Sequence, residues 1–209
     1  MQCLTYPIGP LETNCYLIFS DTESVVIDSG GPPDKLLAYI KQQDLKLTHI
    51  LLTHLHFDHT YGVKALVKAT GAEALASEKD RFMLESEMGL GGLWGMPPVP
   101  KFDYTPIEPG TLSIAGETCK VLATPGHSPG GLSFYFEGMK SVFSGDSLFY
   151  RSIGRTDLPG GDQDTLLKSI RDQLFSLSAD CIVYPGHGPS STIGNEKRTN
   201  PCSSDFIVI

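Results

Sequence analysis

Five of the six histidines fall in three short clusters whose spacing suits a metal ion that does chemistry. The clusters are Thr53-His54-Leu55-His56-Phe57-Asp58-His59, Thr124-Pro125-Gly126-His127 and Pro185-Gly186-His187-Gly188. Imidazole nitrogen and carboxylate oxygen bind zinc, iron and manganese, whereas structural zinc sites usually take cysteine, which these clusters lack. The clusters therefore predict a catalytic metal centre.

The first cluster directly follows the apolar run 49–53, which has the composition of a buried strand. His54 and His56 are separated by one residue, so in an extended or loop geometry both point the same way while Leu55 points into the core. Asp58 and His59 come one step later and can face a second ion. We interpret this stretch as a loop that wraps a metal.

Two further carboxylates end apolar strands. Asp146 follows the run 141–144 and Gly145, and we predict that it bridges two metals. Asp28 ends the strand 25–27 and is a candidate to accept an imidazole N–H from a ligand; the alternative is an ordinary turn former. His49, inside its strand run, is predicted to be structural.

Composition limits the classes of function. The chain of 209 residues is long enough for a single α/β domain over 1–209. The net charge of −8 argues against a nucleic-acid surface and favours a small substrate. We expect no membrane segment, a cytoplasmic location, and five reduced, mostly buried cysteines. The oligomeric state stays open.

Periodicity predicts helices over 33–43, 61–70 and 163–177, and a long surface loop from Met88 to Tyr104. That loop could cover a substrate pocket, pack against another subunit or join the core. Strands are predicted over 14–19, 24–28, 119–123, 132–136, 140–144 and 181–184. Two mixed β-sheets flanked by helices, a four-layer αββα sandwich, account for this order and bring the metal clusters to one sheet edge.

With these residues in place, the pattern His54-x-His56-x-Asp58-His59, His127, Asp146 and His187 resembles the metallo-β-lactamase superfamily over nearly the whole chain. Within it, the chain is similar to the glyoxalase II group, the hydroxyacylglutathione hydrolases, at segments 14–16, 28–31, 124–128 and 144–146. The resemblance implies one metal on His54, His56 and His127, another on Asp58, His59 and His187, and Asp146 shared between them.

The chain departs from eukaryotic glyoxalase II at several positions. We expect no C-terminal helical extension, and Gly188-Pro189 stand where a tyrosine is expected after the last metal histidine. Arg155 occupies the place of a lysine that contacts glutathione, so it suits a substrate carboxylate; a salt bridge with Asp157 or Asp162 is the alternative. Asp157 itself replaces an expected tyrosine.

The predicted function is a binuclear metal-dependent hydrolase of a thioester such as a hydroxyacylglutathione. A hydroxide bridging two divalent ions attacks the carbonyl, with Asp58 and Asp146 as catalytic ligands. We expect Zn²⁺, and iron or manganese suit the same donors. The alternatives are a mononuclear iron persulfide dioxygenase on the same fold and a non-catalytic metal-binding protein, whereas β-lactamase and nuclease activities are not expected.

Overall fold

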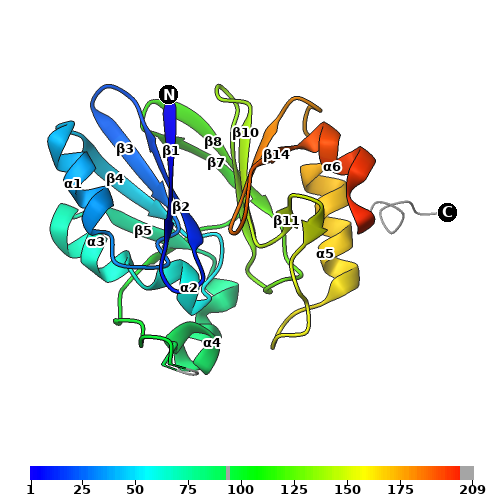
Figure 1. The fold of residues 1–209 in the computed structure, drawn as a ribbon, viewed down its shortest axis with the longest axis horizontal. Helices are drawn as coiled ribbons and strands as arrows, with labels where there is room; N and C mark the ends of the chain where they lie inside the picture. The colour runs from blue at the N-terminus through cyan, green and yellow to red at the C-terminus, as the bar shows by residue number, and fades with distance from the viewer. Residues whose placement is uncertain (93–94, 203–209) are drawn as a thin grey trace. The chain divides into compact units, whose positions relative to one another are not determined.

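The computed structural model describes residues 1–92 and 95–202, and it contains two six-stranded β-sheets and one two-stranded sheet (Figure 1). The chain divides into two compact units, Met1–Ile107 with Ser113–Glu117, and Glu108–Leu112 with Thr118–Ile209. The expectation of one domain over 1–209 stays a prediction.

The first sheet has the order β1-β2-β3-β4-β5-β6 and is mixed: β1 to β3 are antiparallel, and β3 to β6 are parallel. Its strands are β1 (Gln2–Ile8), β2 (Thr13–Phe19), β3 (Glu23–Ile27), β4 (Lys46–Leu51), β5 (Glu73–Ala76) and β6 (Thr105–Pro106). Helices α1 (Asp34–Gln42) and α3 (Val63–Thr70) bury Leu36, Ile40 and Leu66 in one core with Val26 and Ile50. These helices pack on the sheet because each has one apolar face.

The second sheet has the order β14-β13-β10-β9-β8-β7 and is also mixed, since β10 and β13 are parallel while β8, β9 and β10 alternate. Its strands are β7 (Gly110–Ile114), β8 (Glu117–Ala123), β9 (Leu132–Phe136), β10 (Ser141–Gly145), β13 (Ile182–Pro185) and β14 (Ser191–Thr192). Strands β11 (Leu148–Phe149) and β12 (Ser152–Ile153) form a separate hairpin.

Three helical segments complete the second unit: α5 (Gln163–Ser169), its π-helical continuation η2 (Ile170–Leu174) and α6 (Ile193–Thr199). They bury Leu166, Ile170 and Ile193 against Val142 and Val183 of the sheet. The predicted α/β class with two mixed sheets and helices is therefore confirmed.

Some boundaries differ from the sequence prediction. The helix expected over 61–70 begins at Val63, and a separate helical turn, α2 (Phe57–Thr60), precedes it. Asp58 and His59 thus stand in a helical turn and not in a loop. The predicted C-terminal end is correct, because Gly71 takes a left-handed conformation, with φ 71°, and its N–H bonds to Val67.

The segment predicted as a loop over 88–104 begins in a helix, because α4 (Glu87–Leu90) follows the 3₁₀ segment η1 (Glu78–Glu85). Leu93 and Trp94 lie outside the described residues. Phe102 and Tyr104 pack against the core of the first unit. Of the three alternatives for this segment, core packing is the one that these two residues follow. A hollow of about 290 Å³ lies beside it, with a lining that includes Arg81, Leu84, Leu90, Val99, Phe102 and Tyr104.

All five cysteines are free thiols, and three of them are buried, as predicted. Burial raises the pKa of Cys3 and Cys119 to about 12 and that of Cys181 to about 11. In residues 1–92 and 95–202, no helix has the length and apolar character that crossing a membrane requires.

Candidate metal centre

Asp28 and the first histidines come together because β3 and β4 are parallel. Ile27 pairs with Leu51 at the ends of these strands, so the residues that follow leave the sheet at one edge. The Asp28 N–H donates to the Leu51 carbonyl at 3.0 Å. Parallel pairing therefore places the carboxylate of Asp28 beside the segment that carries His54.

The Asp28 carboxylate is almost fully buried and accepts three hydrogen bonds. The Thr53 N–H donates to Oδ1 at 2.9 Å, the Thr53 hydroxyl donates to Oδ2 at 2.8 Å, and the His59 Nδ1 lies 2.8 Å from Oδ2. Asp28 also has a φ of 55°, a left-handed conformation that Asp and Asn tolerate better than most residues. Asp28 thus lies within hydrogen-bond distance of an imidazole nitrogen of His59, and its role toward a metal ligand stays a prediction.

These contacts fix the protonation of two rings. The Thr53 hydroxyl gives its proton to Asp28, so its oxygen accepts from the His54 Nδ1 at 3.0 Å. His59 likewise donates from Nδ1 to Asp28. Neutral imidazole carries one N–H, so both rings keep the lone pair on Nε2 for a metal. The His54 ring centroid lies 4.6 Å from that of His56 and 4.1 Å from that of His59.

Helical turn α2 is held against the segment Asp28–Gly31 by backbone contacts. The Ser29 N–H donates to the His59 carbonyl at 2.8 Å, and the Gly62 N–H donates to the Ser29 carbonyl at 2.7 Å. A Cβ at Gly30 would lie 1.8 Å from the Asp58 carbonyl oxygen, so only glycine permits this approach. Asp58 Oδ2 accepts from the Thr13 hydroxyl at 3.2 Å.

In the second unit, β8, β10 and β13 run in the same direction, so their carboxyl ends meet at one edge of the sheet. His127, Asp146 and His187 each follow one of these ends. Oδ2 of Asp146 lies 3.6 Å from Nε2 of His127 and 3.6 Å from Nε2 of His187. The carboxylate oxygen is therefore equidistant from two imidazole nitrogens.

The tautomer of His127 is also fixed. Its Nδ1 lies 2.8 Å from the Arg155 carbonyl oxygen, which can only accept, so Nδ1 carries the proton and Nε2 the lone pair. The role of the Arg155 carbonyl was not predicted, because a backbone oxygen leaves no signal in the residue type. The hydroxyls of Thr13 and Thr53 were not predicted either, although Thr53 directly precedes His54.

The spacing of these donors suits a metal. A distance of 3.6 Å also separates His59 Nε2 from Asp58 Oδ2, and it exceeds the range of about 2.7–3.2 Å for a hydrogen bond. Two ligands at about 2.0–2.1 Å from one tetrahedral ion lie about 3.4 Å apart. A cation also offsets the cost of burying the Asp58 carboxylate, which is 7% exposed. The residues present therefore fit divalent ions.

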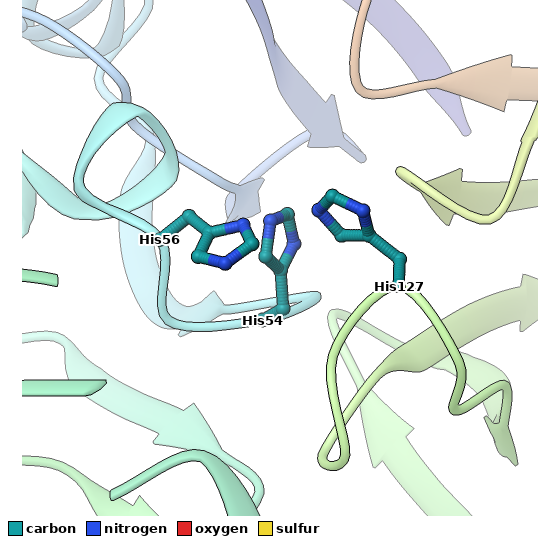
Figure 2. Close-up of side chains that lie close together, drawn as sticks. All are labelled: His54, His56 and His127. Atoms are coloured by element: carbon teal, nitrogen blue, oxygen red, sulfur yellow. The ribbon is translucent and has the colours of Figure 1, made fainter. Parts of the chain in front are cut away.

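The predicted ligands form two groups of metal-binding donors, one in each unit. The first unit carries His54, His56, Asp58 and His59, and the second carries His127, Asp146 and His187. Figure 2 labels His54 and His56 of the first group and His127 of the second. Among the described residues, His49 occurs in neither, and its Nδ1 lies 3.0 Å from the Thr48 hydroxyl. The assignment of ligands to individual ions stays a prediction.

Arg155 forms the ion pair that the sequence offered as an alternative to substrate binding. Its Nε lies 2.7 Å from Oδ1 of Asp157 and its Nη2 2.6 Å from Oδ2, and both side chains are exposed. The hydrogen bond from Arg155 lowers the pKa of Asp157 to about 2. Asp162 instead accepts from the Thr165 N–H at 2.8 Å and caps α5.

Comparison with known families agrees with this geometry. A model of the metallo-beta-lactamase superfamily matches residues 8–187, and the chain belongs to this superfamily. It is 40% identical over 200 residues to hydroxyacylglutathione hydrolase GloC of Haemophilus influenzae, a match that covers 93% of this chain and 94% of that protein. It is 37% identical over 211 residues to the probable metallo-hydrolase YqgX of Bacillus subtilis, with 100% of both chains covered.

Two solved structures are also similar. The structure of BLEG-1, described as a B3 metallo-beta-lactamase, superposes with a TM-score of 0.91 at 39% identity and covers 97% of this chain and 100% of that chain. A di-iron form of TTHA1623 superposes with a TM-score of 0.85 at 40% identity, and the match covers 95% of this chain and 98% of that chain. The superfamily and the His/Asp groups together indicate a binuclear metal site in a metal-dependent hydrolase.

Proposed function

We propose that this protein hydrolyses a small thioester, of the hydroxyacylglutathione class, at a binuclear metal centre. One ion is held by His54, His56 and His127, the other by Asp58, His59 and His187, and Asp146 is shared. The observation that carries the proposal is the position of Asp146 Oδ2, 3.6 Å from Nε2 of both His127 and His187. A carboxylate oxygen near two imidazole nitrogens suits a bridging ligand.

When bound, divalent ions supply a nucleophilic hydroxide at neutral pH, because they lower the pKa of water to about 7. The protein's own groups prepare the site. Asp28 accepts a hydrogen bond from Nδ1 of His59, which makes the lone pair on Nε2 of His59 more basic toward a metal. The Thr13 hydroxyl orients the Asp58 carboxylate. The Arg155 carbonyl holds the ring of His127 in one orientation.

A thioester suits this set of groups because its leaving group needs little help. A thiol with a pKa of about 8.5 departs as the thiolate, so no general acid has to protonate it. An alkoxide or an amide nitrogen requires that proton. The similarity to GloC, named a hydroxyacylglutathione hydrolase, supports the same substrate class.

Arg155 is our candidate for binding a carboxylate of the thiol portion. Its planar guanidinium already holds the carboxylate of Asp157 with two hydrogen bonds. Both side chains are exposed, so a substrate carboxylate could exchange for Asp157. Zinc is our first choice of metal, and the di-iron form of TTHA1623 supports iron as the second.

The test measures turnover by zinc-loaded and iron-loaded protein on four substrates. They are a hydroxyacylglutathione, the same acyl group on a thiol without carboxylates, a β-lactam, and glutathione persulfide with oxygen uptake recorded. We expect hydrolysis of the glutathione thioester to be fastest, and His56→Ala to abolish it while His49→Ala does not. Faster β-lactam hydrolysis, or oxygen uptake with a single iron, would reject the thioester assignment.

A further inference from the structure

A buried carboxylate that is not among the predicted ligands, nine residues after His187, forms a complete set of hydrogen bonds. Glu196, in α6, is fully buried. Its Oε2 accepts from the backbone N–H of Arg151 at 2.8 Å and from Nδ2 of Asn200 at 2.9 Å. Its Oε1 accepts from Nδ2 of Asn195 at 3.0 Å and from the hydroxyl of Ser191. Burial of such a charge is costly unless it is fully hydrogen-bonded, as it is here.

These bonds attach α6 to the turn of the β11–β12 hairpin, and Figure 1 labels both α6 and β11. Arg151 lies in that turn with a φ of 55°, so its N–H belongs to a strained left-handed residue. Asn200 also donates from Nδ2 to the Ser152 carbonyl at 3.1 Å. Glu196 and Asn200 together hold the backbone of the turn from two sides.

The base of the same hairpin carries parts of the predicted metal centre. Asp146 comes just before β11, and the Gly154 N–H donates to the Ser147 carbonyl at 3.3 Å. A Cβ on Gly154 would lie 1.8 Å from the Asp146 carbonyl oxygen, so the two backbone segments pack too closely for any side chain at this position. The next carbonyl, of Arg155, holds Nδ1 of His127.

The hairpin also contacts the third predicted ligand of this unit. The ring of Phe149 in β11 lies 6.3 Å from the ring of His187, at an angle of 68°. One two-stranded hairpin therefore contacts or adjoins His127, Asp146 and His187. Its turn is fixed by the carboxylate of Glu196, whose hydrogen bonds within the described part of the chain involve none of these three residues.

We infer that Glu196 is a positioning residue for the metal centre, acting through the β11–β12 hairpin. Stability alone gives little reason for this carboxylate, since replacing a buried charge and its partners with apolar groups is often neutral or stabilising. A carboxylate with two oxygens can hold the Arg151 N–H and the Asn200 amide at once, which fixes the turn in one conformation. The inference rests on the proposed metal centre for its functional meaning.

The experiment substitutes Glu196→Gln and uses Leu174→Ala as the control for stability. Glutamine keeps one acceptor oxygen but turns an NH₂ group toward donors on one side. Leu174, the last residue of η2, is fully buried in the core of the same unit, and none of the hydrogen bonds to the hairpin involves it. Both variants are expected to lower the melting temperature.

Three measurements separate positioning from stability. We expect Glu196→Gln to weaken zinc affinity by about tenfold, as measured by competition with a chelator. This is the lower end of the loss seen when a residue that orients a metal ligand is substituted. Amide hydrogen exchange should rise over residues 147–155. The value of kcat should fall with KM unchanged. Leu174→Ala should leave zinc affinity and exchange over 147–155 at wild-type values.

Asn200→Ala is a second variant that keeps the inference testable if Glu196→Gln does not fold. It removes the bonds to Ser152 and Glu196, and we expect a smaller loss of zinc affinity in the same direction. The inference is overturned if, in all three variants including Leu174→Ala, the loss of zinc affinity and the rise in exchange over 147–155 are simply proportional to the fall in melting temperature. Zinc affinity and exchange test it even if the wild-type protein hydrolyses no thioester, so the two proposals can fail separately.

Discussion

Nδ1 of His59 lies 2.8 Å from Oδ2 of Asp28, and this carboxylate also accepts two hydrogen bonds from Thr53, the residue before His54. One buried carboxylate thus sets the tautomer of His59 directly and that of His54 through a hydroxyl. Asparagine tolerates the left-handed backbone of Asp28 as well as aspartate does, so Asp28→Asn removes the charge and keeps the turn.

We expect Asp28→Asn to weaken metal affinity and kcat/KM by about 10- to 100-fold, because the imidazoles lose their anionic partner. Metal competition and steady-state kinetics measure the two effects. Asp180→Asn is the matched control, since Asp180 pairs with Lys140 at 2.7 Å on the surface. Equal metal affinity in Asp28→Asn and the control would contradict a role for Asp28 at the metal.

Asp146→Ala and His49→Ala test which donors bind metal. Loss of the shared carboxylate should lower metal content and reduce kcat/KM by more than about a hundredfold. This exceeds the effect of substituting a residue that only hydrogen-bonds to a metal ligand. His49 lies in β4 with its Nδ1 on the Thr48 hydroxyl, so its loss should leave both unchanged. Elemental analysis of each purified variant provides the measurement. Full metal content and turnover in Asp146→Ala would show that Asp146 is not the bridge.

The Arg155–Asp157 pair predicts a dependence on substrate charge. Asp157→Asn removes the anion that now holds the guanidinium, so the KM for a thioester with a carboxylate on its thiol should fall. Arg155→Gln should raise that KM by about tenfold, the effect of losing a charge-assisted hydrogen bond. For a thioester without the carboxylate, both variants should match the wild type. If the two substrates respond equally, Arg155 does not bind a carboxylate.

Gly30→Ala should disrupt the first half of the site. The new Cβ would lie 1.8 Å from the Asp58 carbonyl oxygen, so α2 must move or the chain must strain. We expect a loss of unfolding free energy of about 3 kcal/mol, at the upper end for overpacking, together with reduced metal content. Gly110→Ala is the control, because the nearest atom to its Cβ is 3.9 Å away. Urea unfolding of both variants measures the difference.

The buried and half-buried thiols predict that the free energy of unfolding falls at high pH. Burial raises the pKa of Cys3 and Cys119 from 9.0 to about 12, and burial also raises the pKa of Cys15. Between pH 9 and 12 the unfolded chain binds fewer of these protons than the folded chain, so stability is lost as the pH rises.

The buried thiols should also react slowly with a disulfide reagent at pH 8 until urea is added. Fast labelling of the three buried cysteines, Cys15, Cys119 and Cys181, in the folded protein would contradict their burial.

Much of the site could be predicted from residue types and spacing. The donors His54, His56, His59, His127 and His187 and the carboxylates Asp58 and Asp146 stand out because each follows an apolar strand and carries metal-binding chemistry. The alternation of strands and helices likewise predicted two mixed sheets. These features are local, so the order of residues along the chain determines them.

The tertiary structure decided the rest, because it depends on contacts between residues distant in sequence. Parallel pairing of β3 with β4 brings Asp28 to Thr53 and His59, and the turn α2 could form because Gly30 leaves room for the Asp58 carbonyl. The tautomer of His127 depends on a carbonyl 28 residues away, and the β11–β12 turn on the carboxylate of Glu196. The sequence therefore determined which groups could bind metal, and only the fold decided how each is oriented and protonated.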